Sequence, residues 1–172
     1  MARAYNRLPN IYADIEDVFG KIKQQVPVFE DSLVMLQHSM DRCESISAKE
    51  KYSLNELEKV EALKNRFIRV TDLILEVFLP LTDKMDGEKM GTIIDQFKRA
   101  EKKEIINKAD DLIRIKNLSK DLYRSHFPDG LNEYLGPLIK QAPFLFEYFD
   151  GFIRYAKYRG FYIEPEKLSL PN

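Results

Sequence analysis

Apolar residues recur at intervals of three or four positions along most of the chain, and this spacing predicts helices. The strongest run predicts a long core helix over residues 54–79. We expect this helix to end near Leu79, because Pro80 lacks a backbone donor and its ring collides with the preceding turn. The apolar seam of this helix consists of Leu57, Val60, Leu63, Phe67, Val70, Ile74, Val77 and Leu81.

Other runs with the same spacing predict further helices, the first of which should end near Pro27. Gly136-Pro137 and Pro143 should kink or divide the last helix. No stretch alternates apolar and polar residues over the length of a strand, so nothing predicts a sheet. The expected fold class is therefore all-α, an up-and-down bundle of five or six helices. Besides residues 54–79, the expected helices cover residues 9–27, 28–46, 92–101, 107–124 and 131–158.

We expect a single domain over residues 1–172, because this length is sufficient for one substantial core and short for two. Residues 1–28 are expected to add an extra N-terminal helix to a bundle formed by residues 29–158. Residues 159–172 are expected to form an irregular tail. At the start of the long helix, Ser53 and Glu56 have the spacing of a capping box.

Composition and charge narrow the classes of function. The net charge is −1, so no overall basic field indicates a nucleic-acid partner. No run of about eighteen apolar residues predicts a membrane span, and the first residues lack the apolar core of a secretory signal. Cys43 is the single cysteine and lies on an apolar stripe, which indicates a buried thiol rather than a disulfide or a nucleophile. These features predict a cytoplasmic protein that makes no contact with a membrane.

The common motifs of cofactor and metal sites do not occur. The sequence has no glycine-rich phosphate loop, no GxSxG and no HExxH. Two histidines and one cysteine are too few for a zinc site unless carboxylates fill most positions. We therefore expect no cofactor and no metal. The aromatic residues from Phe144 to Tyr158 go all round their helix, which predicts a second buried face formed by oligomerisation.

The helix over residues 107–124 carries the one local pattern that indicates chemistry. Lys116, Lys120 and Tyr123 share one polar face of it, because neighbours three, four and seven apart lie above one another. A second polar face contains Asn117, Asp121 and Arg124.

The segment from Lys116 to Tyr123 resembles the signature of HEPN domains, which runs Arg-Asn-x-x-x-His-x-Tyr. Asn117 and Tyr123 match it, while Lys116 stands for the arginine and Asp121 for the histidine. The order of predicted helices over residues 29–158 is also similar to the family's plan of two long antiparallel helices, a short helix, the motif helix and a closing helix. The nearest similarity is to prokaryotic HEPN proteins paired with minimal nucleotidyltransferases in toxin–antitoxin modules. The resemblance implies a homodimer with the motif helices near its axis, a nucleotidyltransferase partner, and in some relatives a nucleotidylated tyrosine at the place of Tyr123.

The two departures from the signature act against catalysis. In active members of the family the arginine and histidine perform metal-independent RNA cleavage. A histidine titrates near neutral pH, whereas Asp121 is normally ionised there and gives no proton. Lys116 lacks the bidentate fork of a guanidinium. We therefore expect a non-catalytic, HEPN-like binding protein that contacts a nucleotidyltransferase, or a nucleotide or RNA, through Lys116, Asn117, Lys120, Asp121 and Tyr123.

Two alternatives stay open. The first is a divergent metal-independent ribonuclease that uses Arg114 or Arg124 with His126, although neither pair has the family spacing. The simpler interpretation of these arginines is that they pair with Asp121 on a polar face or at a dimer contact. The second alternative is a structural helical adaptor without a ligand site.

Overall fold

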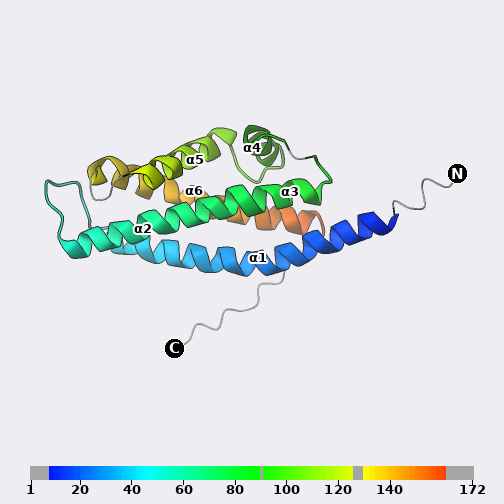
Figure 1. The fold of residues 1–172 in the computed structure, drawn as a ribbon, viewed down its shortest axis with the longest axis horizontal. Helices are drawn as coiled ribbons and strands as arrows, with labels where there is room; N and C mark the ends of the chain where they lie inside the picture. Colours follow the sequence, from blue (N-terminus) through cyan, green and yellow to red (C-terminus); the bar gives the residue numbers. More distant parts are fainter. Residues whose placement is uncertain (1–7, 90, 126–129, 162–172) are drawn as a thin grey trace, which may run out of the picture.

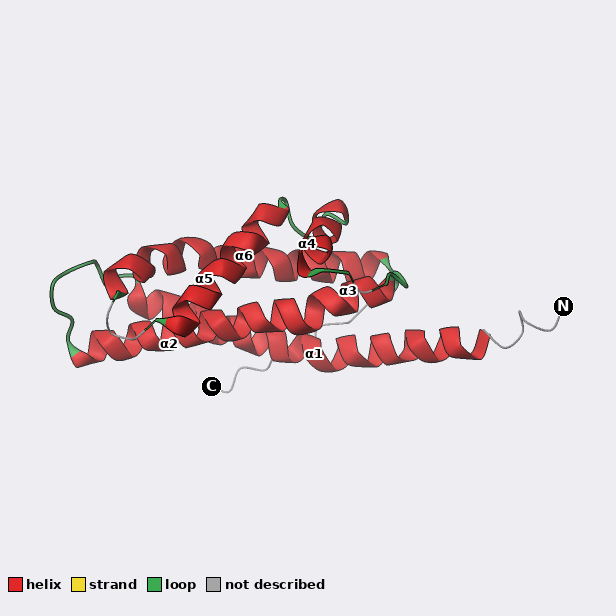
Figure 2. Ribbon diagram, turned by 45° about the horizontal axis from the view of Figure 1, so that its top comes forward, coloured by secondary structure: helices red, strands yellow, loops and turns green. Residues whose placement is uncertain are grey.

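The chain folds into an elongated, all-helical bundle, described here from a computed structural model. The structure describes residues 8–89, 91–125 and 130–161, with the backbone alone for residues 8–13. Within these residues every regular element is a helix and no strand is present (Figure 2). The main rods run alternately in opposite directions, as α1, the rod from α2 to α3, α5 and α6 show in Figure 1. The predicted all-α, up-and-down bundle is confirmed.

The first helix, α1 (Leu8–Cys43), is continuous, so the predictions of two helices and of a separate N-terminal helix over residues 1–28 are wrong. Pro27 removes one backbone donor, but Pro27 and Lys23 are both exposed, so water can solvate the Lys23 carbonyl that loses its bond. Val26 and Phe29 on either side of Pro27 are buried in one core. The apolar face is therefore continuous across the proline, and burial of that face stabilises the helix through it.

The second rod extends beyond the predicted end at Leu79. It comprises α2 (Leu54–Asp72), a π-helical segment η1 (Leu73–Phe78) and α3 (Leu79–Met85). The backbone N–H of Leu79 donates to the carbonyl of Ile74, five residues back. This wider turn directly precedes Pro80, whose ring would collide with a carbonyl in a regular α-helix. The rod therefore passes Pro80, and the prediction of a stop there is wrong.

The π-helical turn also changes which residues face the core. Phe78 is fully buried, whereas Val77, which belongs to the predicted seam, is half-buried. An extra residue in one turn rotates everything that follows it by about 100°. At the other end of the rod the capping box of Ser53 and Glu56 is present, as predicted.

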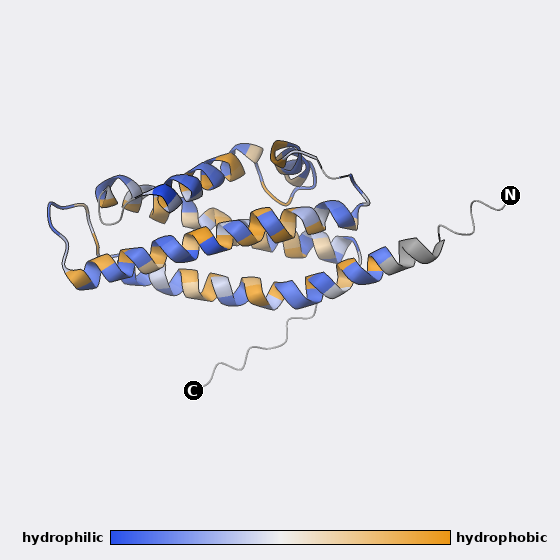
Figure 3. Ribbon diagram, viewed as in Figure 1, coloured by the Kyte–Doolittle hydropathy of each residue, from blue (hydrophilic) through white to orange (hydrophobic). Residues whose placement is uncertain are grey.

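The remaining helices have the predicted extents to within two residues. They are α4 (Ile93–Lys102), α5 (Ala109–Arg124) and α6 (Leu131–Tyr158). Pro137 and Pro143 lie inside α6 without dividing it, and both are exposed, as at Pro27. The hydropathy pattern along each rod shows apolar residues alternating with polar ones at helical spacing (Figure 3).

The core is centred on aromatic side chains from three rods. The ring of Phe29 lies 4.6 Å from Phe78 and 4.8 Å from Phe149, centroid to centroid, and Phe78 lies 4.7 Å from Phe152. Such pairs each contribute about 0.5–1.5 kcal/mol beyond the burial of their area. α1, α2 and α5 all pack on α6, and Tyr148, Phe149 and Phe152 are buried within one chain. Phe144, Phe146 and Tyr155 are half-buried and Tyr158 is exposed, so the second, oligomeric face stays a prediction.

None of the described helices combines the length and apolarity that a membrane span requires.

Candidate functional site

The helix that carries the HEPN-like segment, α5, lies on the outside of the bundle (Figure 1). Its apolar stripe faces inward and is buried. The side chain of Lys108 does not cap the N-terminus of α5. Instead, the carboxylate of Glu101 in α4 accepts a hydrogen bond from the backbone N–H of Ala109 at 2.8 Å. A carboxylate at this end is favourable, because it satisfies a free donor and opposes the positive end of the helix dipole. The buried residues of α5 are Ala109, Leu112, Ile115, Leu118, Ser119 and Leu122.

The predicted binding residues lie together on the opposite, outer side of α5. Asn117, Lys120 and Asp121 are exposed, Lys116 is half-buried, and Tyr123 is 79% exposed. We call this set the α5 polar face. The pockets of about 720, 410 and 270 Å³ in the described part of the chain are all lined by other residues. The α5 polar face is therefore an open surface rather than a site that encloses a small molecule.

The two arginines of the ribonuclease alternative, Arg114 and Arg124, are exposed on α5. Arg114 forms an ion pair with Asp111, one turn earlier on α5, whose side chain is largely buried. No ion pair joins Arg114 or Arg124 to Asp121 among the described residues, so the pairing expected on one polar face is wrong, while a pairing across a dimer contact stays a prediction. His126 lies outside the described residues.

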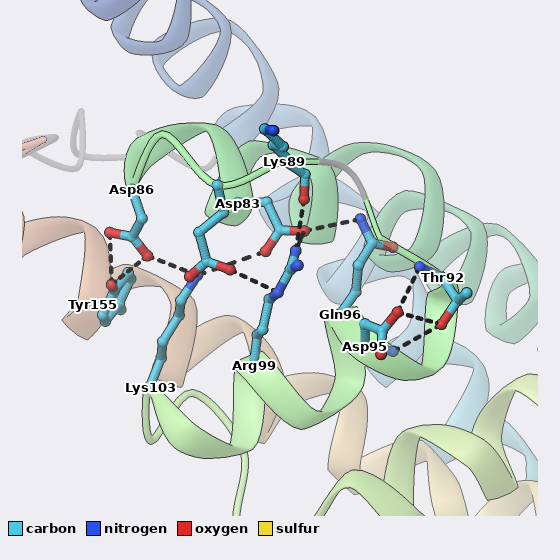
Figure 4. A network of polar contacts seen from close by, with 10 residues as sticks. Asp83, Asp86, Lys89, Thr92, Asp95, Gln96, Arg99, Lys103 and Tyr155 are labelled. Carbon is cyan, nitrogen blue, oxygen red and sulfur yellow. Dashed lines mark hydrogen bonds and ion pairs between the residues drawn. The ribbon is translucent and has the colours of Figure 1, made fainter.

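A polar cluster that sequence reasoning missed joins the end of α3 to α4 and α6 (Figure 4). The Asp83 carboxylate is almost fully buried and lies 2.9 Å from Arg99 Nη1. Arg99 Nε lies 2.6 Å from Glu88, and Lys103 Nζ lies 2.6 Å from Asp86 and 3.1 Å from Glu88. Paired charges of this kind avoid the cost of an isolated buried ion.

Two residues of α6 and its C-terminus complete this cluster. Tyr155 donates its hydroxyl to Asp86 at 2.8 Å, and Arg159 Nε lies 2.8 Å from the same carboxylate. Burial tends to raise the pKa of Asp86, but the bonds from Lys103 and Tyr155 outweigh it and hold that pKa below its ordinary value. Burial and the bond to Asp86 raise the pKa of Tyr155 well above its ordinary value. Both groups are therefore fixed in one protonation state near neutral pH, which suits a structural tie better than acid–base catalysis.

The sequence signal for this cluster is the mixed run from Asp83 to Glu88, which faces the basic residues of α4. Such a run is ordinarily a solvated face, and only the packing of α4 against α3 shows that it is partly buried. In the described part of the chain no group of three or more His, Cys, Asp or Glu side chains is placed to hold a metal ion.

A pocket of about 720 Å³ opens beside the cluster, between the 86–88 turn, the end of α4 and the last turns of α6. Next to it the loop after α4 crosses α6 in close contact. A Cβ at Gly151 would lie 1.9 Å from the carbonyl oxygen of Ile105, so only glycine fits there. Glu104 has a φ of 56°, and Arg154 Nη2 donates to its carbonyl at 2.9 Å. A non-glycine residue in this conformation is strained and needs such support.

Comparison with known proteins adds no relative, because no family model, no curated protein and no solved structure matches the chain.

Proposed function

We propose that the protein is a non-catalytic, HEPN-like binding protein of the cytoplasm that contacts a nucleotidyltransferase-type protein through the α5 polar face. The observation that carries this proposal is the placement of the segment from Lys116 to Tyr123. Its polar side chains lie on the outer side of α5, while the apolar positions between them are buried. A partner can therefore reach all of them without unfolding any part of the bundle.

The absence of catalysis is supported by the chemistry of Asp121. Its side chain is exposed, and no side-chain hydrogen bond or ion pair of the described residues orients it. Water competes for a charged group on an open surface, which weakens the electrostatic stabilisation on which phosphoryl chemistry depends. Lys116 beside it offers a point charge rather than a bidentate clamp.

A protein partner is favoured over RNA by the charge balance of α5. The four cations of α5 are offset by three aspartates, which leaves the helix a net charge of only +1; they are Arg114, Lys116, Lys120 and Arg124 against Asp110, Asp111 and Asp121. RNA affinity depends mainly on the number of phosphates that unpaired cations neutralise. An exposed tyrosine such as Tyr123 is instead typical of a protein contact, where it supplies a large apolar area and a hydroxyl.

The test first establishes whether a nucleotidyltransferase is encoded beside the gene, and its absence would count against the proposal. The affinity of the full chain for that protein is then measured by titration calorimetry. We expect Tyr123→Ala and Lys120→Glu each to weaken binding by about tenfold or more, as at an interface anchor. Tyr158→Ala is the matched control, because Tyr158 is equally exposed at 82% but lies at the end of α6. Equal affinity of all three variants and the unaltered protein would overturn the proposed surface and favour the adaptor alternative.

Dimerisation is tested separately by sedimentation of the purified chain over a range of concentrations. If the motif helices meet at the dimer axis, as the HEPN resemblance implies, Lys120→Glu shifts the dimer toward monomer, whereas Tyr158→Ala leaves it unchanged. A chain that stays monomeric at every concentration contradicts the homodimer.

The ribonuclease alternative is tested by incubating RNA with the purified protein in the presence of a chelator. We expect no cleavage above background. Cleavage that is lost in Lys116→Ala or His126→Ala would overturn the non-catalytic proposal, because the first substitution removes the cation at the signature position and the second removes the imidazole that the alternative needs.

A further inference from the structure

One pocket of the bundle is separate from the α5 polar face. It lies beside the polar cluster and has a volume of about 720 Å³, within the range typical of sites for small organic ligands. Its lining includes Lys102, Arg154, Tyr155 and Tyr158. These residues come from the end of α4 and the last two turns of α6, both of which pack into the core.

The wall of the pocket carries more cations than the ion pairs of the polar cluster use. Four cations and three carboxylates line it. Arg99 and Lys103 are held by carboxylates of the polar cluster, at distances between 2.6 and 3.1 Å. Lys102 and Arg154 form no ion pair with a described carboxylate, and Arg154 donates only to the Glu104 carbonyl among the described contacts. These two side chains therefore keep their charge available for a bound anion.

The same wall presents two tyrosine rings. Their centroids lie 6.3 Å apart, and the Tyr155 hydroxyl is fixed by its bonds to Asp86 at 2.8 and 2.9 Å. The Tyr158 ring is 82% exposed, although it is large and mostly apolar. An exposed ring next to free cations suits a ligand that has both a planar ring and a negative charge.

We propose that this pocket binds a nucleoside phosphate, with the base stacked on Tyr158 and the phosphates held by Lys102 and Arg154. The polar cluster keeps the wall rigid, and its cations pair with Asp86 and Glu88. Of the carboxylates that line the pocket, Glu104 alone has no ion-pair partner among the described residues, and the two cations Lys102 and Arg154 outnumber it. The crossing of the loop at Gly151 and the bond from Arg154 to Glu104 position the guanidinium at the rim of the pocket. This site is independent of the proposed partner surface on α5.

The test is a calorimetric titration of the full chain with ADP in the presence of a chelator. We expect a Kd on the order of tens of micromolar, with adenosine and inorganic phosphate each binding at least about tenfold more weakly, because each lacks one of the two contacts. Raising the salt concentration should weaken ADP binding, since the phosphate contacts are electrostatic.

Variants identify the residues that bind. Tyr158→Ala and Lys102→Ala should each reduce the affinity for ADP by roughly tenfold, which is the scale of one stacking or one charged contact. Lys98→Ala on α4 is the matched control, since Lys98 is exposed on the same helix as Lys102 and does not line the pocket. This control should bind ADP as tightly as the unaltered protein.

Two outcomes overturn the proposal. One is no detectable binding of ADP up to about 1 mM. The other is binding that Tyr158→Ala and Lys102→Ala leave unchanged, which would place ADP elsewhere. Neither outcome affects the partner surface on α5, because its test uses Tyr123 and Lys120, and Tyr158→Ala serves there as the control.

Discussion

The contact between Gly151 and the loop after α4 predicts that two chemically identical substitutions have opposite effects on stability. Gly20 and Gly151 both lie inside helices, α1 and α6, and neither has a positive φ. A Cβ at Gly20 would meet no atom within 4 Å, whereas a Cβ at Gly151 would lie 1.9 Å from the Ile105 carbonyl oxygen. Real Cβ atoms do not approach other atoms more closely than 3.0 Å, so the loop or α6 must move by about 1 Å.

The magnitude follows from three contributions. Alanine at either position stabilises the helix by about 0.5–1 kcal/mol, because glycine loses more backbone entropy on folding. At position 151 the forced displacement of a packed backbone costs about 1–3 kcal/mol. Loss of the bond from Arg154 to the Glu104 carbonyl costs roughly a further 0.5–1.5 kcal/mol. We therefore expect Gly20→Ala to raise the free energy of unfolding by about 0.5–1 kcal/mol and Gly151→Ala to lower it by about 0.5–4 kcal/mol.

The assay is urea unfolding followed by far-ultraviolet circular dichroism, with the slope of the transition checked for each variant. The alanine gain is common to both variants, so they should differ by the strain and the lost hydrogen bond, about 1.5–4.5 kcal/mol in the free energy of unfolding, with Gly151→Ala the less stable. A Gly151→Ala protein that is as stable as Gly20→Ala would refute the close crossing of the loop over α6. It would also remove the support for the placement of Arg154 at the rim of the pocket.

Two further predictions concern single titratable groups. Hydrogen bonds from Lys49 and Ser53 lower the pKa of Glu56 from its ordinary value of 4.5 to about 2. Its contribution to stability is therefore complete above the unfolded value and is lost as the pH falls from 4.5 toward 2. In Glu56→Gln this part of the fall in stability should disappear in unfolding curves recorded across that range, and a profile parallel to that of the unaltered protein would contradict the assignment. Burial raises the pKa of Cys43, whose side chain is fully buried, so a thiol-specific disulfide reagent should modify it only as the protein unfolds in urea. Rapid, complete labelling of the native protein would show that Cys43 is accessible.

The pattern of apolar residues predicted the helices well because helix formation and amphipathicity are local properties. The bounds of α4, α5 and α6 follow from spacings of three and four, and the capping box at Ser53 follows from two residues. The same pattern placed the HEPN-like segment on a helix with its polar side chains outward. Which side of a helix a residue faces depends only on its position in the sequence and on the regular geometry of that helix.

The prolines show what local rules miss. Pro27, Pro137 and Pro143 all lie inside helices, although each lacks a donor that the helix would use. A proline ends a helix only if the lost bond and the displaced carbonyl are not compensated, and here exposure to water provides the compensation. At Pro80 a π-helical turn provides it instead, and the rotation of that turn moves Phe78 rather than Val77 into the core.

The sequence by itself determined the helical class of this protein, the extents of its shorter helices and the outward polar face of α5, since each depends on neighbours within one or two turns. Tertiary structure alone decided that four prolines are tolerated, that Tyr148, Phe149 and Phe152 of α6 are buried within one chain, and that acidic residues at and after the end of α3 meet basic residues at the end of α4 beside a pocket. The physical reason is that burial, pairing of charges and close backbone contacts depend on which helices lie side by side. Residues far apart in the chain acquire these properties only when the bundle brings them together.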